Sequence, residues 1–184
     1  PFVDDVLMQK IEERIVIPTV NGLQKENIDY KGFVFIGLIN VNNEPFVIEY
    51  NVRMGDPETE VVLPRIKSDL VELFEATFHQ ELDKTSIEID ERAATTVMIV
   101  SGGYPEAYEK GKIISGIKNI EDSIVFHAGT SIKDEKFVTN GGRVLAITSM
   151  DMNYKKALKK SYQNIEKLHF DAMNYRKDIG FDLT

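Results

Sequence analysis

The chain contains no cysteine among its 184 residues, which excludes disulfide bonds, thiolate metal sites and cysteine nucleophiles. It also has no apolar run near the roughly 20 residues that a membrane-spanning helix needs. Its first residues, Pro1 to Asp5, form neither the basic nor the apolar part of a secretory leader. They run directly into a helical pattern without an initiator Met, as expected of a chain cut from a longer one. We therefore expect a cytoplasmic protein that binds no membrane.

Basic residues are in the minority, with 22 Lys and Arg against 30 Asp and Glu and a formal net charge of -8. This balance disfavours nucleic acid as a partner, because phosphate backbones bind clustered Lys and Arg. Small anionic substrates remain open, since each needs only a local basic group. With 42% hydrophobic and 28% charged residues, the chain is long enough for one typical domain or two small ones.

The first half of the sequence predicts a helix, a hairpin and two further helical segments. Apolar residues recur at helical spacing from Asp4 to Lys25, where Pro18 should kink or end the helix and Asn21-Gly22 is a stop or a weak point. Residues 32–39 and 46–52 have strand character and are joined by turn chemistry at 42–45, which predicts an antiparallel hairpin. Gly55-Asp56-Pro57 predicts a helix start, and a second helical segment is expected over 68–82 after a break at Pro64.

The polar stretch 83–92 is the best candidate for a domain boundary. After it the sequence pattern changes from helical segments to short strands separated by turns. Short strands are expected at residues 95–100, 112–117, 124–128, 137–138 and 143–148. Turn signals lie at 102–105 and 140–142, and a helix is expected over 153–168. No repeat or low-complexity segment is present. The second half therefore predicts a small β-rich α+β unit.

The stretch 47–53 carries the clearest chemical pattern. A strand period of two places Glu49, Asn51 and Arg53 on one face and apolar residues on the other. The carboxylate of Glu49 and the amide oxygen of Asn51 can then converge on one hard cation. Mg²⁺ prefers oxygen ligands and takes only one or two protein groups, leaving its other positions to waters and substrate phosphates. The alternation alone also fits an ordinary amphipathic strand, in which Arg53 forms a surface ion pair with Glu58 or Glu60.

Acidic residues follow this strand at the expected helix start. A helix N-terminus usually binds anions, but Asp56 and Glu58 compete for its backbone donors. Contact with an amine, a hydroxyl or Arg53 is therefore expected there in preference to a phosphate. The alternative for Asp56 is a plain N-cap.

These segments together resemble the phosphoribosylamine-glycine ligase family, also called glycinamide ribonucleotide synthetase. The Glu-x-Asn-x-Arg strand alone is typical of ATP-grasp ligases in general, and the Gly-Asp-Pro-Glu-Thr continuation narrows the resemblance to this family. The segments that resemble the family, in order along the whole chain, are 30–33, 49–59, 68–73, 102–105, 126–130, 139–145 and 176–180.

The resemblance implies an α+β fold in which residues 1–82 are the carboxy-terminal part of an ATP-grasp domain and 83–184 a small β-rich carboxy-terminal domain. It implies ATP-dependent ligation of glycine to 5-phosphoribosylamine by way of a glycyl phosphate, with Mg²⁺ or Mn²⁺ as cofactor. Glu49 and Asn51 would hold the metal and, through it, ATP. We place Arg53, Asp56 and Glu58 as catalytic residues at the substrate end, and Arg143 as a candidate phosphate contact.

The sequence departs from this pattern in two ways. Residues 33–40 offer no acidic metal ligand on the preceding strand, and no Gly-rich phosphate loop or partner lysine is found. We therefore expect the amino-terminal domains of the same protein as partners, and no ligase activity from this chain alone. The alternatives are another ATP-grasp carboxylate-amine ligase, a carboxylase subunit, or a noncatalytic interaction module whose acidic face binds a partner protein. A dry, closed face around Glu49 and Asn51 would favour the last of these.

Overall fold

A computed structural model describes residues 3–183, so Pro1, Phe2 and Thr184 lie outside the described part. The chain forms two compact units. The first holds the residues up to Gly55 together with Ser68–Ile87, and the second holds Asp56–Lys67 together with Glu88–Asp182. Helices and antiparallel strands are mixed, which confirms the α+β class. The domain boundary after residue 82 remains a prediction, because a compact unit and a family domain need not coincide.

A helical stretch opens the first unit, made of α1 (Asp5–Ile11), a π-helical segment (Glu12–Val16) and α2 (Ile17–Lys25). The side chain of Asp4 caps α1 by accepting from the N–H of Leu7 at 2.8 Å. Pro18 lacks the N–H that would bind four residues back, and the wider π turn lies directly before it. Gly22 lies inside α2, so Asn21-Gly22 does not stop the helix. None of these helices, nor any other in the described part, is long and apolar enough to cross a membrane.

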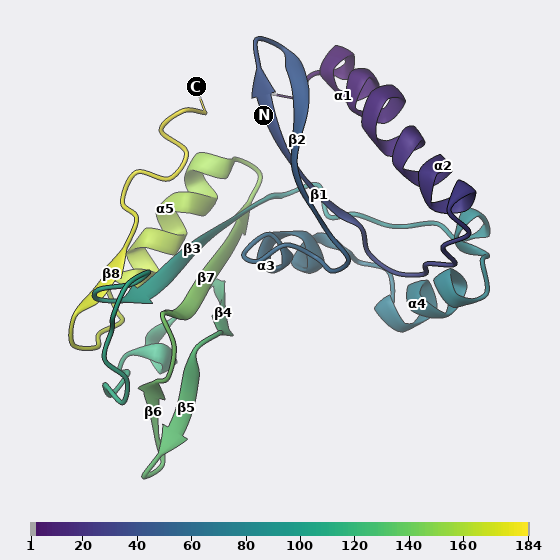
Figure 1. The fold of residues 1–184 in the computed structure, drawn as a ribbon. Helices are drawn as coiled ribbons and strands as arrows, with labels where there is room; N and C mark the ends of the chain where they lie inside the picture. Colours follow the sequence, from purple (N-terminus) through teal and green to yellow (C-terminus); the bar gives the residue numbers. More distant parts are fainter. Residues whose placement is uncertain (1–2, 184) are drawn as a thin grey trace. The chain divides into compact units, whose positions relative to one another are not determined.

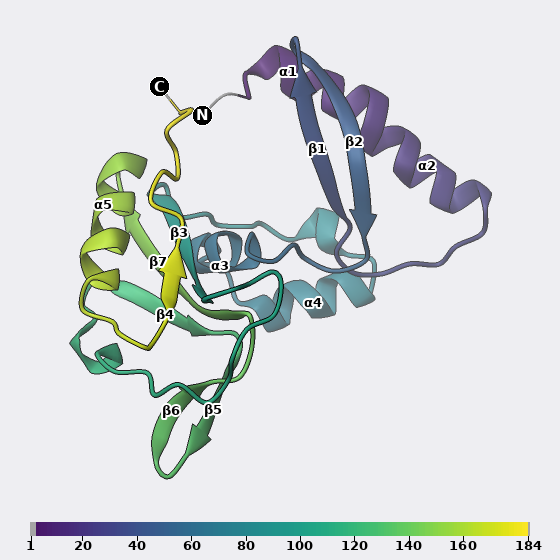
Figure 2. The same cartoon turned by 60° about the vertical axis from the view of Figure 1, so that its left-hand side comes forward.

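The expected hairpin is confirmed as β1 (Phe35–Val41) paired antiparallel with β2 (Glu44–Asn51). Asn42 and Asn43 form its turn with φ of 54° and 63°, as tight hairpin turns require. The ladder contains a β-bulge, because Gly37 pairs with Glu49 while the next residue of β1 pairs with Val47. Figure 2 shows the hairpin beside α1 and α2.

Ion pairs and a few apolar contacts hold the first unit together. The Glu44 carboxylate accepts from Lys10 Nζ at 2.5 Å and from Arg14 Nη1 at 2.6 Å, joining α1 and its extension to the start of β2. The hydrogen bond from Lys10 lowers the pKa of Glu44 below its usual range. Leu7 and Leu73 are the deeply buried apolar side chains of α1 and α4 (Leu70–Phe78).

The second unit takes in the segment that follows the hairpin. This segment contains α3 (Thr59–Val62) and a 3₁₀ turn (Leu63–Arg65). Glu58 is the N-cap of α3, so the alternative reading of Asp56 as a plain N-cap is wrong. The Arg65 guanidinium donates to the Asp90 carbonyl at 3.0 and 3.2 Å, which attaches the segment to the chain that leads into β3.

A four-stranded antiparallel sheet forms the body of the second unit, in the order β4-β7-β3-β8. Its strands are β3 (Ala93–Ser101), β4 (Ser123–His127), β7 (Arg143–Asp151) and β8 (Met173–Tyr175). Helix α5 (Tyr154–Ile165) lies along this sheet (Figure 1). The fully or nearly fully buried apolar residues of the resulting core are Val97, Ile99, Ile114, Val144, Leu145, Ile147, Ile165, Leu168 and Phe170. Each large side chain of this kind contributes about 1.5–3 kcal/mol by leaving water.

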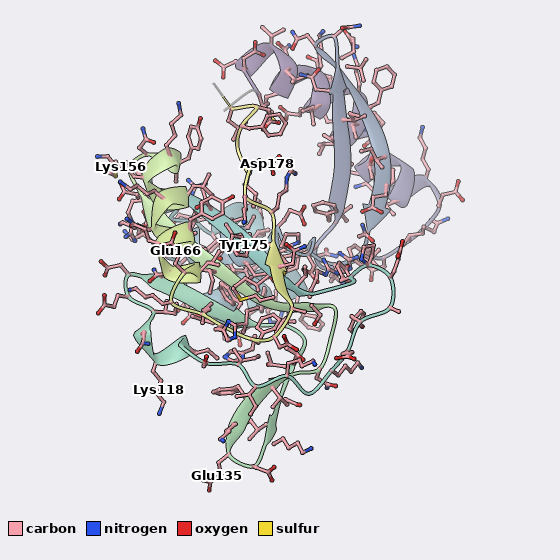
Figure 3. The ribbon with its side chains drawn as sticks, turned by 90° about the vertical axis from the view of Figure 1, so that its left-hand side faces the viewer. Lys118, Glu135, Lys156, Glu166, Tyr175 and Asp178 are labelled. Atoms are coloured by element: carbon pink, nitrogen blue, oxygen red, sulfur yellow. The ribbon has the colours of Figure 1, made fainter. Side chains whose placement is uncertain are left out.

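A second hairpin, β5 (Thr130–Lys133) with β6 (Lys136–Thr139), extends from the second unit with Glu135 at its tip (Figure 3). The strand expected over 112–117 is wrong, because Ile113 and Ser115 make only isolated bridges there and a 3₁₀ turn (Ile117–Asn119) follows. The expected strands near 95–100, 124–128, 137–138 and 143–148 and the final helix are confirmed within a few residues. A short 3₁₀ turn (Leu82–Lys84) follows α4.

Candidate active site

Glu49 lies on β2 directly opposite Gly37 of β1. A Cβ atom added to Gly37 would come within 3.0 Å of the Glu49 Cγ, so the missing side chain makes the space that Glu49 occupies. Glu49 is exposed to solvent. A carboxylate in this position is accessible to a ligand.

Asn51 ends β2 and lies within hydrogen-bonding distance of Glu49. Its Nδ2 donates to Glu49 Oε1 at 2.9 Å. The contact brings together the two residues predicted to hold a metal. A half-turn of the amide exchanges Nδ2 with Oδ1, which would place an amide oxygen beside the carboxylate. The pair therefore offers the oxygen donors that Mg²⁺ or Mn²⁺ prefers.

The donor set of this pair is small. Among residues 3–183, no group of three or more His, Cys, Asp or Glu side chains could hold a metal ion. The preceding strand, β1, contains no acidic residue that could add a ligand. One carboxylate and one amide suit Mg²⁺, which keeps waters and takes phosphate oxygens as its remaining ligands. A metal that needs a full cage of protein ligands does not fit these residues.

Arg53 lies two residues beyond the end of β2, so the strand alternation that placed it beside Glu49 and Asn51 does not extend to it. Its Nη1 donates to the carbonyl of the next residue, Met54, at 2.8 Å. The chain bends at Val52 and Arg53, and the β-strand geometry needed for the predicted common face has ended there. The proposed catalytic role of Arg53 remains a prediction.

Asp56 and Glu58, the two other predicted catalytic residues, belong to the second unit. Asp56 is bound by Arg143, whose Nη1 lies 3.2 Å from Asp56 Oδ1 and 3.1 Å from the Asp56 carbonyl oxygen. Glu58 directly precedes α3, and its carboxylate does not accept a hydrogen bond from the free N–H groups of the helix. Burial raises the pKa of the neighbouring Glu60.

Sequence reasoning missed Gly37, and it placed Glu60 only in a surface ion pair. A lone glycine within an apolar strand signals a close approach of another group, so Gly37 could have been found. Nothing in the sequence singles out Glu60 from the other acidic residues of its segment. The Oε2 atom of Glu60 is buried without a hydrogen-bond partner among the described residues. This burial results from the packing of α3, which the sequence does not reveal.

An apolar cavity of about 480 Å³ lies between α2 and the end of β2. Leu23, Ile28 and Val52 contribute to its wall, and Asn51 also borders it. The hydroxyl of Tyr50, another wall residue, is 3.1 Å from the Thr19 hydroxyl and is therefore engaged. Such a lining does not suit a phosphate, so this cavity adds no phosphate site to the Glu49 and Asn51 pair.

Two family descriptions match the chain in sequence. Residues 1–59 match the phosphoribosylglycinamide synthetase ATP-grasp (A) domain, and residues 94–182 match the phosphoribosylglycinamide synthetase C domain. The chain belongs to the phosphoribosylglycinamide synthetase family. The A-domain match includes Glu49 and Asn51, and it ends at Thr59.

Curated relatives of the phosphoribosylglycinamide synthetase family support this membership. The chain is 44% identical over 185 residues to a phosphoribosylamine–glycine ligase of Escherichia coli O157:H7, covering 98% of the chain and 43% of that protein. It is 43% identical over 180 residues to the ligase of the same name from Caldanaerobacter subterraneus subsp. tengcongensis, with the same two coverages. The chain thus spans less than half the length of these relatives.

Solved structures agree on the fold of the family. A crystal structure of phosphoribosylamine–glycine ligase from Thermotoga maritima matches 97% of the chain and 44% of its own length, with a TM-score of 0.85 and 36% identity. N5-carboxyaminoimidazole ribonucleotide synthetase from the same organism matches 92% of the chain and 43% of its own length with a TM-score of 0.58. At 15% identity the second match shows a shared fold alone.

Proposed function

We propose that this chain forms part of a ligase that joins glycine to 5-phosphoribosylamine at the expense of ATP. The observation that carries the proposal is the contact between Glu49 and Asn51 in a chain whose relatives are named phosphoribosylamine–glycine ligases. Two oxygen donors side by side on one strand are what a site for Mg²⁺ and nucleotide phosphates requires. We propose the cytoplasm as its compartment.

The proposed reaction has two steps. A carboxylate oxygen of glycine attacks the γ-phosphorus of ATP, forming glycyl phosphate while the bond to ADP breaks. The amine of phosphoribosylamine then attacks the glycyl carbonyl carbon, forming the amide while the bond to phosphate breaks and the amine loses a proton. Mg²⁺ or Mn²⁺, when bound, would neutralise charge on the phosphates. Glu49 and Asn51 are the residues of this chain that would hold the ion, and Arg53, Asp56 and Glu58 are the proposed substrate-side residues.

The remaining domains of such a ligase are proposed partners of the first unit. Large apolar side chains on β2 and directly after it are exposed within this chain, including Ile48 at 65% and Val52, the residue after the strand, at 74%. Isolated two-stranded hairpins are marginal in water, and apolar strand faces are usually covered. We therefore propose that amino-terminal domains of the same polypeptide cover this face and supply the groups that bind the rest of ATP.

Two assays test the proposal. A polypeptide that joins this chain to the amino-terminal domains of the family is expected to release ADP and phosphate only when both glycine and phosphoribosylamine are present. Turnover with a different acid and amine pair, and none with glycine, would instead favour another carboxylate-amine ligase. The 184-residue chain by itself is expected to be inactive, and amide formation by the isolated chain would contradict the need for partner domains.

A further inference from the structure

The Arg143 side chain in the second unit is tied to a single residue by two contacts. Its Nη1 donates to the Asp56 carbonyl oxygen at 3.1 Å and lies 3.2 Å from the Asp56 carboxylate. The Arg143 and Asp56 side chains are 39% and 50% exposed. Two acceptors on one residue define the position of the end of a long, flexible side chain. The guanidinium is thus oriented and still accessible to solvent.

The backbone that carries Arg143 is fixed as well. A Cβ atom on Gly142 would lie 2.1 Å from a ring carbon of Tyr104, and one on Gly141 would lie 2.8 Å from the Cα of Gly129. The buried Ser101 donates its hydroxyl to the Gly141 carbonyl at 2.9 Å and its N–H to the Gly142 carbonyl at 2.8 Å. The turn before Arg143 is therefore packed and hydrogen-bonded, and both ends of the side chain are held.

This arrangement differs from the other Arg and Asp ion pairs between side chains that the structure describes in the second unit. Arg92 pairs with Asp90 and Arg176 pairs with Asp178, in each case only two residues away in the sequence. Asp56 and Arg143 are 87 residues apart. A local pair forms wherever the backbone allows it, whereas the distant pair depends on the packing of the whole unit.

We propose that Arg143 contacts the oxyanion of a substrate and that Asp56 is a positioning residue that orients the Arg143 guanidinium. The proposal rests on the proposed ligase function. A guanidinium suits a carboxylate or a phosphate, because its planar set of N–H donors matches two oxygens at once. The two sources are the carboxylate of glycine and the phosphate of phosphoribosylamine. Asp56, placed above among the catalytic residues, acts through Arg143 in this reading.

Acidic neighbours narrow the class of ligand. Burial raises the pKa of Glu60, its backbone hydrogen bond and Arg143 lower it, and Asp56 and Glu58 raise it, so Asp56, Glu58 and Arg143 all lie close enough to act on Glu60. These carboxylates weaken, without abolishing, the binding of an oxyanion that has no accompanying positive charge. A ligand that carries an amine as well as an oxyanion suits this mixed set, and glycine and phosphoribosylamine each carry both groups.

Steady-state kinetics of the complete ligase test the proposal with Arg143→Lys, Asp56→Asn and the double variant. Arg143→Lys keeps the charge and loses the planar donors, so we expect the KM for one substrate to rise by about 10-fold or more with a smaller change in kcat. Asp56→Asn should raise the same KM, and the double variant should be no worse than Arg143→Lys alone. The substrate whose KM changes identifies the oxyanion.

Matched controls are Arg92→Lys and Asp90→Asn, which alter another Arg and Asp pair of the second unit and should leave both KM values unchanged. Unchanged KM values in Arg143→Lys would overturn the substrate contact. Additive effects of the two substitutions, or equal effects from the control pair, would overturn the positioning role of Asp56.

Binding measurements separate this inference from the proposed function, because they need no turnover. Isothermal titration of the same proteins with glycine and with ribose 5-phosphate should show one ligand weakened about 10-fold in Arg143→Lys. If the polypeptide binds this ligand through Arg143 but forms no amide, the ligase function is refuted while the proposed oxyanion site at Arg143 stands. Equal binding of both ligands by the wild type and Arg143→Lys would refute the site.

Discussion

Gly37 faces Glu49 across the β1–β2 ladder, and a Cβ atom at residue 37 would lie 3.0 Å from the Glu49 Cγ. Gly37 does not have the positive φ that would by itself require glycine. Its role is therefore to leave space on the strand surface. The proposed metal ligand depends on a neighbour that contributes no atoms to the site.

Gly37→Val should disturb this site without unfolding the hairpin. The β-branched side chain favours a strand and would push against Glu49, because even the first added carbon is in tight contact. Supporting residues of metal sites typically contribute 10- to 100-fold in affinity, so we expect Mn²⁺ binding by the complete ligase to weaken by about 10-fold. Titration calorimetry gives the affinity, and thermal unfolding should show no loss of stability.

Gly22→Ala is the matched control, because a Cβ atom there would meet nothing within 4 Å. Gly22 lies inside α2, so alanine should stabilise the protein by about 0.5–1 kcal/mol and leave Mn²⁺ binding unchanged. If Gly37→Val bound Mn²⁺ as tightly as the wild type, Glu49 would not be a ligand or would not need the space.

Glu49→Gln tests the charge of the proposed ligand. Glutamine keeps the size of the side chain and an oxygen that can accept from Asn51, but it loses the negative charge that a cation needs. We expect kcat of the complete ligase to fall on the order of 100-fold or more at saturating Mg²⁺, while the unfolding temperature changes little.

Glu44→Gln makes the same change at the other end of β2, where the carboxylate pairs with Lys10 and Arg14. This control should affect stability alone, and only slightly, because exposed ion pairs contribute little to folding. Near-normal turnover in Glu49→Gln, or an equal loss in Glu44→Gln, would remove Glu49 from the proposed site.

The pair Glu49 and Asn51 could be predicted from sequence because strand alternation is a local rule. The alternation rule holds only to the end of a strand. Because β2 ends at Asn51, the rule does not apply to Arg53. The hairpin turn was readable from Asn42 and Asn43, whose residue type tolerates a positive φ. The contact of Asp56 with Arg143 joins segments far apart in the chain, and no local pattern contains such a pairing.

Glu60 should give the protein a stability that falls as pH rises. Burial raises its pKa in the folded chain above the ordinary value of 4.5, with Asp56 and Glu58 adding to the shift and Arg143 opposing it. Between the ordinary value and the raised one, the unfolded chain has lost the proton that the folded chain still holds, so raising the pH favours unfolding. Below this range both states are protonated, and above it the loss is complete.

Glu60→Gln removes this titration, so wild-type stability relative to the variant should decline as pH rises above 4.5 and then level off. Urea unfolding of both proteins from pH 3.5 to 8 measures the difference. A difference in stability between the two proteins that is the same at every pH reflects the buried amide of the glutamine and does not bear on the test. A difference that stays flat with pH, or that grows in favour of the wild type, would show that the folded pKa of Glu60 is not raised.

Asn164 on α5 joins the helix to the entrance of β4 through the backbone of Glu121. Its Nδ2 donates to the Glu121 carbonyl at 2.7 Å and to the Ser123 hydroxyl at 2.8 Å, and its Oδ1 accepts from the Glu121 N–H at 3.3 Å. The side chain is 4% exposed. Asn164→Ala leaves these partners without their bonds, and a buried polar group that loses its partner costs about 1–3 kcal/mol. We expect a loss of this size in urea unfolding.

Asn164→Asp separates the hydrogen bonds of Asn164 from its packing. Aspartate has nearly the same shape but cannot donate to the Glu121 carbonyl, and it places a charge in a buried position. At neutral pH it should therefore be at least as destabilising as alanine, although it leaves no cavity. A variant as stable as the wild type would show that the helix is held by its apolar face alone, through Ile165 and its neighbours in the core.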